Sequence, residues 1–324
     1  MRRELGEMLK GLRAFAIPMP VRFRGITVRE GALIRGPAGW GEFSPFAEYG
    51  PQESARWLAS ALESATAGWP GPARDRIPVN VTVPAVGPEQ AMKIVAGSGC
   101  RTAKVKVAER GQAESEDIER VEAVREALGP DGRIRVDANG GWEPGQAARM
   151  LRRLARFGLE YAEQPCATLD ELAELRRHID IPIAADESIR RAEDPLRVRA
   201  AGTADIVMLK VQPLGGVRAA LRVAEACGLP AVVSSAVDTS VGLAAGVALA
   251  AALPDLPYAC GLGTMSLLAG DVTARPLAPE SGSLPVRRPD VDPDELARWE
   301  ADPAPWRERA RAAVRFLPDA EGGA

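Results

Sequence analysis

The sequence predicts an α/β fold, a (β/α)8-type barrel or its modified (β/α)7β form, joined to an α+β capping domain. Two observations lead to this prediction. From about residue 77, short apolar segments of strand character alternate with helical segments, which is typical of parallel βαβ units. Polar residues also recur where these apolar segments end, and in a barrel such ends meet at one face. A doubly wound open sheet is the alternative, but no G-x-G-x-x-G or P-loop motif supports it.

The N-terminal segment has a mixed, partly β character. Residues 23–36 alternate enough to form strands, and an amphipathic helix follows from about Gln52, with Trp57, Leu58 and Leu62 on one side. Between them, residues 39–50 carry several aromatic side chains. These side chains form either a small local core or a lid over a ligand, and the local core is the more ordinary interpretation.

The predicted barrel strands follow one another at regular intervals. They lie at 77–86, 101–108, 133–137, 161–165, 181–186, 204–210 and 230–235, with a weaker eighth strand at 256–261. Helices are expected from Pro88, over 114–128 and from Pro144, where proline suits a first helical turn. The Pro- and Arg-rich tail is expected to form helices that return to the N-terminal segment. The predicted domains are therefore a cap of residues 1–76 plus 271–324 and a barrel of residues 77–270.

Composition excludes several classes of protein. The chain has 324 residues, 46% of them hydrophobic, and a formal net charge of −3, so it lacks the basic surface of a nucleic-acid binder. The apolar stretch at 241–253 is too short to span a bilayer. The four cysteines show no C-x-x-C spacing, which favours buried thiols in a reducing, cytoplasmic compartment. With His178 as its only histidine, expected at a helix end, the chain must hold any metal through oxygen ligands.

Carboxylates stand at the ends of three consecutive predicted strands. Asp137 ends the third strand, Glu163 the fourth and Asp186 the fifth, each one βα unit after the last. Side chains at these ends converge at the barrel mouth, where three carboxylates form an oxygen site suited to Mg²⁺. Asn139 follows Asp137 by two residues and points to the same side. Each acidic residue alone would more often be a helix cap or a turn former.

Lysines occur on two other predicted strands. Lys104 and Lys106 are two residues apart, so both point into the barrel, and Lys210 ends the sixth strand. We expect the two neighbouring ammonium groups to lower each other's pKa and so favour a neutral general base. A K-x-K pair is usually a solvated face, and Lys210 could extend its ammonium to water. The valines around the pair and the apolar run before Lys210 favour burial and function instead.

The motifs AKVKV, RVDANGGW, EQP, AADES and MLKVQPLGG, in this order and spacing, resemble the enolase superfamily and its muconate-lactonizing-enzyme-like subgroup. The resemblance covers nearly the whole chain. It implies that Asp137, Glu163 and Asp186 bind Mg²⁺, for which Mn²⁺ can substitute. It also implies that Lys106 and Lys210 act as acid/base groups on a small carboxylate substrate.

Within that subgroup, the short length and residues 234–254 resemble the o-succinylbenzoate synthases of menaquinone biosynthesis. This resemblance implies a lyase that dehydrates 2-succinyl-6-hydroxy-2,4-cyclohexadiene-1-carboxylate to 2-succinylbenzoate. Supporting or substrate contacts are expected from Lys104, Asn139, Ser234, Ser235 and Gly261. The alternatives are an N-succinylamino-acid racemase or dipeptide epimerase and, in another class, a non-catalytic small-molecule-binding barrel. We expect neither a nucleic-acid nor a membrane partner, and the choice between monomer and homo-oligomer stays open.

Overall fold

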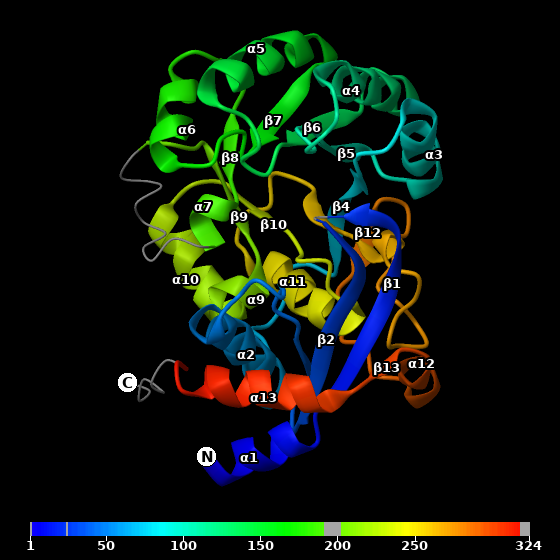
Figure 1. Ribbon diagram of the computed structural model, residues 1–324, viewed down its shortest axis with the longest axis vertical. Coiled ribbons are helices and arrows are strands. Elements are labelled where there is room, and N and C mark those ends of the chain that lie inside the picture. The colour runs from blue at the N-terminus through cyan, green and yellow to red at the C-terminus, as the bar shows by residue number, and fades with distance from the viewer. Residues whose placement is uncertain (1, 24, 191–201, 318–324) are drawn as a thin grey trace.

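The computed structural model describes residues 2–23, 25–190 and 202–317, which form a cap and a barrel (Figure 1). The cap contains an antiparallel sheet with the strand order β13-β1-β2-β3. Its strands are β1 (Arg13–Phe23), β2 (Ile26–Gly36), β3 (Gly39–Phe43) and β13 (Glu300–Ala301). Its helices are α1 (Arg2–Lys10), α2 (Pro51–Thr66), α12 (Pro293–Arg298) and α13 (Pro303–Val314). The tail thus returns to the N-terminal segment as expected, and Figure 1 shows α13 running beside α2.

Eight parallel strands form the barrel. In chain order they are β4 (Arg76–Val83), β5 (Thr102–Lys106), β6 (Arg133–Asp137), β7 (Leu159–Glu163), β8 (Ile183–Ala185), β9 (Ile206–Leu209), β10 (Ala231–Val233) and β11 (Cys260–Gly263). Neighbours pair in this order, β11 pairs with β4, and a parallel bridge from Ser234 to Gly261 joins β10 to β11. The predicted barrel is therefore confirmed.

Helices connect the strands and cover the outside of the barrel. They are α3 (Pro88–Ser98), α4 (Glu114–Leu128), α5 (Pro144–Leu154), η1 (Ala155–Phe157), α6 (Leu169–Arg176), α7 (Glu187–Arg190), α9 (Val211–Leu214), α10 (Val217–Cys227) and α11 (Ser240–Ala252), whereas η2 (Met265–Leu267) follows the last strand. The described chain after β11 continues into η2 and then β12 (Ser283–Pro285), which pairs antiparallel with β4. The arrangement therefore corresponds to the (β/α)7β form.

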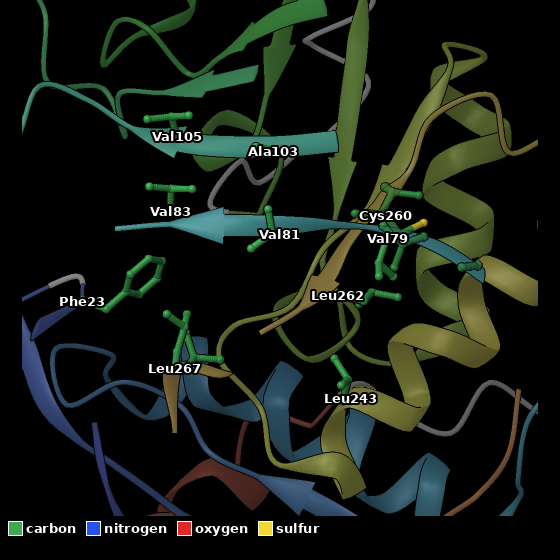
Figure 2. Close-up of a cluster of buried hydrophobic side chains, with 14 of the residues drawn as sticks. Phe23, Val79, Val81, Val83, Ala103, Val105, Leu243, Cys260, Leu262 and Leu267 are labelled. Atoms are coloured by element: carbon green, nitrogen blue, oxygen red, sulfur yellow. The ribbon is translucent and has the colours of Figure 1, made fainter. Parts of the chain in front are cut away.

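Strand alternation separates the outer core from the barrel interior. On β4, Val79, Val81 and Val83 face the helices, and Figure 2 shows Val81 and Val83 beside Ala103 and Val105 of β5 and Val79 beside Cys260 of β11. Residues of the opposite parity point inward, where Tyr161, Ala184, Ile206, Met208 and Val232 form a separate apolar cluster. Because this parity continues to the strand ends, the last inward residue of each strand faces the barrel mouth.

The cap has its own aromatic core. Phe43 packs edge-on against Trp306, while Phe46 packs against Tyr49 and Trp57, with ring centroids 5.8–6.0 Å apart. The local-core interpretation of residues 39–50 is thus confirmed for these rings.

Some local predictions need correction. The eighth strand starts at Cys260 rather than at residue 256, and the tail contains the short strands β12 and β13 besides its helices. His178 is exposed just after α6, as expected, and all four cysteines are buried and free. Among the described helices, none is both long and apolar enough for a bilayer crossing.

Candidate active site

The candidate active site is a small cavity at the mouth of the barrel. It is lined by side chains from strand ends and from one cap strand: Phe23, Thr82, Lys104, Lys106, Asp137, Asn139, Lys210, Ser234, Ser235, Ala236, Val237, Gly261 and Thr264. Its free volume is about 20 Å³, which is room for about one water molecule.

The three predicted carboxylates are buried on neighbouring elements. Asp137 and Glu163 end the adjacent strands β6 and β7 and are directly paired in register, and Asp186 follows β8. Burial, followed by the charges of Asp137 and Asp186, raises the pKa of Glu163 to about 7. The three carboxylates thus lie close enough to interact strongly.

Lys104 lies between two of these carboxylates. Its Nζ is 3.0 Å from Oε1 of Glu163 and 3.1 Å from Oδ2 of Asp137. Burial disfavours the ammonium, but Glu163 and Asp137 outweigh burial and raise the pKa of Lys104 above its ordinary value. The expectation that the neighbouring lysine lowers this pKa is therefore wrong, because carboxylates dominate the surroundings of Lys104.

Lys106 is the last residue of β5, two residues after Lys104, and it lies close to Phe23 of the cap. Its Nζ donates to Oδ2 of Asp137 at 2.5 Å and to Oδ1 of Asn139 at 2.6 Å, and it lies 5.1 Å from the ring centroid of Phe23. Burial alone would raise the pKa of Asp137, but Lys106 and Lys104 hold it well below the ordinary range. Asn139 thus contacts the lysine directly, which agrees with a supporting role.

Lys210 enters the cavity from β9, on the far side of the carboxylates from β5. Its ammonium donates to Oδ2 of Asp186, and both side chains are buried. Gln164 holds the backbone on either side of Asp186 in place, because its Oε1 accepts from the backbone N–H groups of Asp186 and Ser188. The structure thus brings the five predicted charged residues and Lys104 into one site.

The predicted contacts at β10 and β11 also lie in the cavity. Ser234 and Gly261 form the bridge between the two strands, and a Cβ at Gly261 would lie 2.7 Å from Oγ of Ser234. Ser235 pairs with Thr264, with 2.8 Å between the two hydroxyl oxygens. Position 261 therefore requires glycine. The hydroxyl groups of Ser235 and Thr264 form a polar end of the cavity.

Sequence reasoning missed five lining residues, two of which, Ala236 and Val237, lie in the loop after β10. Thr82 is the last inward residue of β4, and the alternation of that strand would have identified it. Thr264 follows β11, whose boundary was predicted too early. Phe23 comes from the cap, and the sequence carries no signal that its ring would reach Lys106.

The donor set fits a hard divalent cation in its chemistry. All three carboxylates are buried, the charges of Asp137 and Asp186 add to burial in raising the pKa of Glu163, and oxygen is the ligand that Mg²⁺ prefers. Among the described residues, however, no group of three His, Cys, Asp or Glu side chains has its ligand atoms arranged to hold a metal ion. Each of the three carboxylates accepts from a lysine ammonium: Asp137 from Lys106, Glu163 from Lys104 and Asp186 from Lys210.

Comparisons with known families agree with this geometry. Residues 88–291 match the enolase C-terminal domain-like family, and residues 14–65 match the enolase N-terminal domain-like family. Among solved structures, the N-succinyl Arg/Lys racemase of Bacillus cereus has a TM-score of 0.76 at 21% identity and covers 90% of this chain and 97% of its own. Muconate lactonizing enzyme of Pseudomonas putida has a TM-score of 0.73 at 22% identity, with coverages of 90% and 99%. These likenesses confirm the fold.

Curated relatives are much more similar in sequence. The o-succinylbenzoate synthase of Thermobifida fusca is 71% identical over 301 residues, which cover 93% of this chain and 95% of the relative. That of Mycobacterium tuberculosis strain H37Ra is 54% identical over 318 residues, with coverages of 97% and 96%. The chain belongs to the enolase superfamily, in its muconate-lactonizing-enzyme-like subgroup, and within that subgroup to the o-succinylbenzoate synthases.

Proposed function

We propose that this chain dehydrates 2-succinyl-6-hydroxy-2,4-cyclohexadiene-1-carboxylate to 2-succinylbenzoate in menaquinone biosynthesis, as a hydro-lyase. The observation that carries the proposal is the 71% identity to an o-succinylbenzoate synthase over nearly the whole of both chains. The cluster of three carboxylates and three lysines at the barrel mouth supplies the chemistry for this reaction.

Asp137, Glu163 and Asp186 are the residues that would hold the divalent metal. We assign Mg²⁺ from the oxygen-only donor set, with Mn²⁺ as a substitute. When bound, the cation would neutralise the substrate carboxylate and stabilise the charge that develops as the neighbouring proton leaves. The proton transfers, the orientation of the substrate and further charge stabilisation are left to the side chains of the chain itself.

Lys106 is the proposed general base. As a neutral amine it takes the proton from C1 of the ring, next to the carboxylate, and the C–H electron pair moves toward the carboxylate. The resulting ammonium gives its proton to the C6 hydroxyl as the C6–O bond breaks, so water leaves and the ring becomes aromatic. Asn139 accepts from Nζ of Lys106 at 2.6 Å and thereby orients it for both transfers.

Lys210 and Lys104 have different proposed roles. Lys210 approaches from the opposite side of the cavity and stabilises negative charge on the ring through its own positive charge, with no proton transfer needed. Lys104 stays an ammonium, because Glu163 and Asp137 surround it and raise its pKa. The positive charge of Lys104 therefore offsets the negative charges of Glu163 and Asp137.

The succinyl tail is expected at the polar end of the cavity. There, Ser235 and Thr264 offer two hydroxyl groups 2.8 Å apart, and Ser234 and Gly261 flank them. Hydroxyl donors of this kind suit a carboxylate or keto oxygen.

A racemase or epimerase is the second candidate function. Two lysines on opposite sides of one cavity are the arrangement needed to remove and return a proton on either face of a carbon atom. The experiment that separates the two functions offers the purified, Mg²⁺-loaded protein the cyclohexadiene substrate, N-succinylamino acids and dipeptides in D₂O. We expect water loss from the first to exceed α-deuterium exchange into the others, and the reverse order would reject the dehydratase assignment.

Two broader proposals concern the domain boundaries and the cellular location of the chain. The first is a cap of residues 1–76 and 271–324 beside a barrel of residues 77–270, which the packing of α13 on α2 supports, while β12 of the tail pairs with the barrel strand β4. The chain acts in the cytoplasm on a small molecule, without nucleic-acid or membrane partners, and its four buried free thiols support a reducing location.

A further inference from the structure

A strained residue lies in the wall of the active-site cavity. Val237 lines the site and has a φ of 62°, in the left-handed region that β-branched residues rarely adopt. Such a conformation persists only where neighbouring groups hold it in place. The contacts around residues 234–238, the wall loop, therefore show what determines its shape.

Backbone hydrogen bonds to the barrel hold the first half of the wall loop. The backbone N–H of Ser234 donates to the carbonyl of Leu209, and that of Ser235 donates to the carbonyl of Gly261. Beyond this point the side chains of the loop take part: Val237 N–H donates to the hydroxyl of Ser235, which contacts that of Thr264. The carboxylate of Asp238 accepts from Ala236 N–H and from Nε2 of Gln212 on α9. The carbonyl group of the strained Val237, by contrast, accepts from outside the barrel.

That contact comes from a buried arginine of the cap. Nε of Arg29, on β2, donates to the carbonyl oxygen of Val237 at 3.0 Å, while Nη2 donates to the carbonyl and hydroxyl oxygens of Ser44 at 2.6 and 2.8 Å. The guanidinium also lies 4.6 Å from the ring centroid of Phe46. The rigid guanidinium of Arg29 thus links the carbonyl group of Val237 to β2 and to the cap segment that follows β3.

A second cap residue holds the end of the wall loop. The carboxylate of Glu42, on β3, accepts from the backbone N–H groups of Thr239 and Gly242 at 3.1 Å each, at the start of α11. A Cβ at Gly242 would lie 2.8 Å from Oε2 of Glu42, so this approach requires glycine. The loop is therefore attached to the cap on both sides of Asp238.

We propose that Arg29 is a positioning residue, which holds Val237 in its left-handed conformation and so sets this part of the active-site wall. Arg29 is outside the described lining of the cavity and acts only through the loop. The proposal rests on the function assigned above, because the wall matters for the substrate of that site.

Three variants of cap arginines separate positioning from folding. Arg29→Lys keeps a positive charge near Glu42 and Asp238 but loses the guanidinium, and Arg29→Met loses both. Arg288→Met is the matched control, since Arg288 donates to the carbonyls of Trp40 and Ser64 within the cap. We expect kcat/KM to fall roughly tenfold to a hundredfold in Arg29→Lys and Arg29→Met. Arg288→Met should stay within a few-fold of wild type.

Rescue at Val237 tests the mechanism of the effect. Glycine adopts positive φ without steric cost, so Val237→Gly removes the strain that Arg29 offsets. Whatever Val237→Gly does alone, the loss caused by Arg29→Lys should shrink to less than about threefold in the Val237→Gly background. An equal loss in both backgrounds would overturn the proposal.

Amide hydrogen exchange gives a readout that does not depend on turnover. Exchange across residues 234–239 should accelerate in Arg29→Lys and return toward the wild-type rate in Arg29→Lys/Val237→Gly, with urea midpoints close to wild type. Unchanged exchange in Arg29→Lys would overturn the proposal. If wild type fails to dehydrate the cyclohexadiene substrate, the assigned function is wrong, and the exchange result still decides the role of Arg29.

Discussion

Lys104→Met is the substitution whose effect follows most directly from the buried charges. It replaces an ammonium that lies 3.0 Å from Glu163 and 3.1 Å from Asp137 with an apolar side chain of similar length. Two buried carboxylates then face each other without this counter-charge. Breaking a buried ion pair by removing one partner typically costs about 3–5 kcal/mol, and we expect a loss of this size in the free energy of unfolding.

The loss should depend on pH and on the metal. The pKa of Glu163 is already raised to about 7, so the loss is largest above pH 7, where Glu163 is ionised, and smaller at pH 5, where its protonation relieves the repulsion. Saturating Mg²⁺ supplies the missing positive charge and should reduce the difference between variant and wild type.

Urea unfolding of both proteins at pH 8, followed by circular dichroism, measures this difference in EDTA and in Mg²⁺. Two results would refute the reasoning. One is a loss below about 1 kcal/mol in EDTA, which would mean that Lys104 does not balance the carboxylates. The other is an equal loss with and without Mg²⁺, which would mean that the cation does not bind among them.

Three further predictions concern single residues. Lys210→Ala should lower kcat at least about a hundredfold with an unchanged circular dichroism spectrum, and near wild-type turnover would remove Lys210 from the mechanism. Burial and Asp238 raise the pKa of Glu42 to about 7 from 4.5, so its ionisation opposes folding and stability falls as pH rises through this window. Glu42→Gln should remove about 3 kcal/mol of that fall between pH 4.5 and 7.5, and urea titrations with parallel profiles would contradict this. Gly261→Ala places a Cβ 2.7 Å from Oγ of Ser234 and should lower kcat/KM about tenfold, whereas unchanged kinetics would show that the bridge can shift.

Much of the barrel could be predicted from sequence because its local signals agree. Apolar strands alternate with helices, and strand parity fixes which side chain faces inward at each end. That is why Lys106, Asp137, Glu163 and Lys210 could be assigned to one site before their positions were known. The weak eighth strand was placed too early because its glycines carry little strand propensity.

Features that depend on contacts between the domains could not be predicted. Phe23 reaches Lys106 from a cap strand, and Arg29 reaches the carbonyl of Val237 across the same boundary. No local pattern marks a valine that will adopt positive φ. The raised pKa of Lys104 was also missed, since it depends on carboxylates from two other strands rather than on the neighbouring lysine.

In the proposed reaction, Lys106 is the base that starts the dehydration of the cyclohexadiene carboxylate. The most direct test is the rate at which Mg²⁺-loaded wild type and Lys106→Ala consume this substrate, followed by its absorbance, with 2-succinylbenzoate identified as the product. We predict rapid conversion by wild type and none above background by a folded Lys106→Ala variant. Equal rates from the two proteins, or no conversion by wild type, would contradict the account.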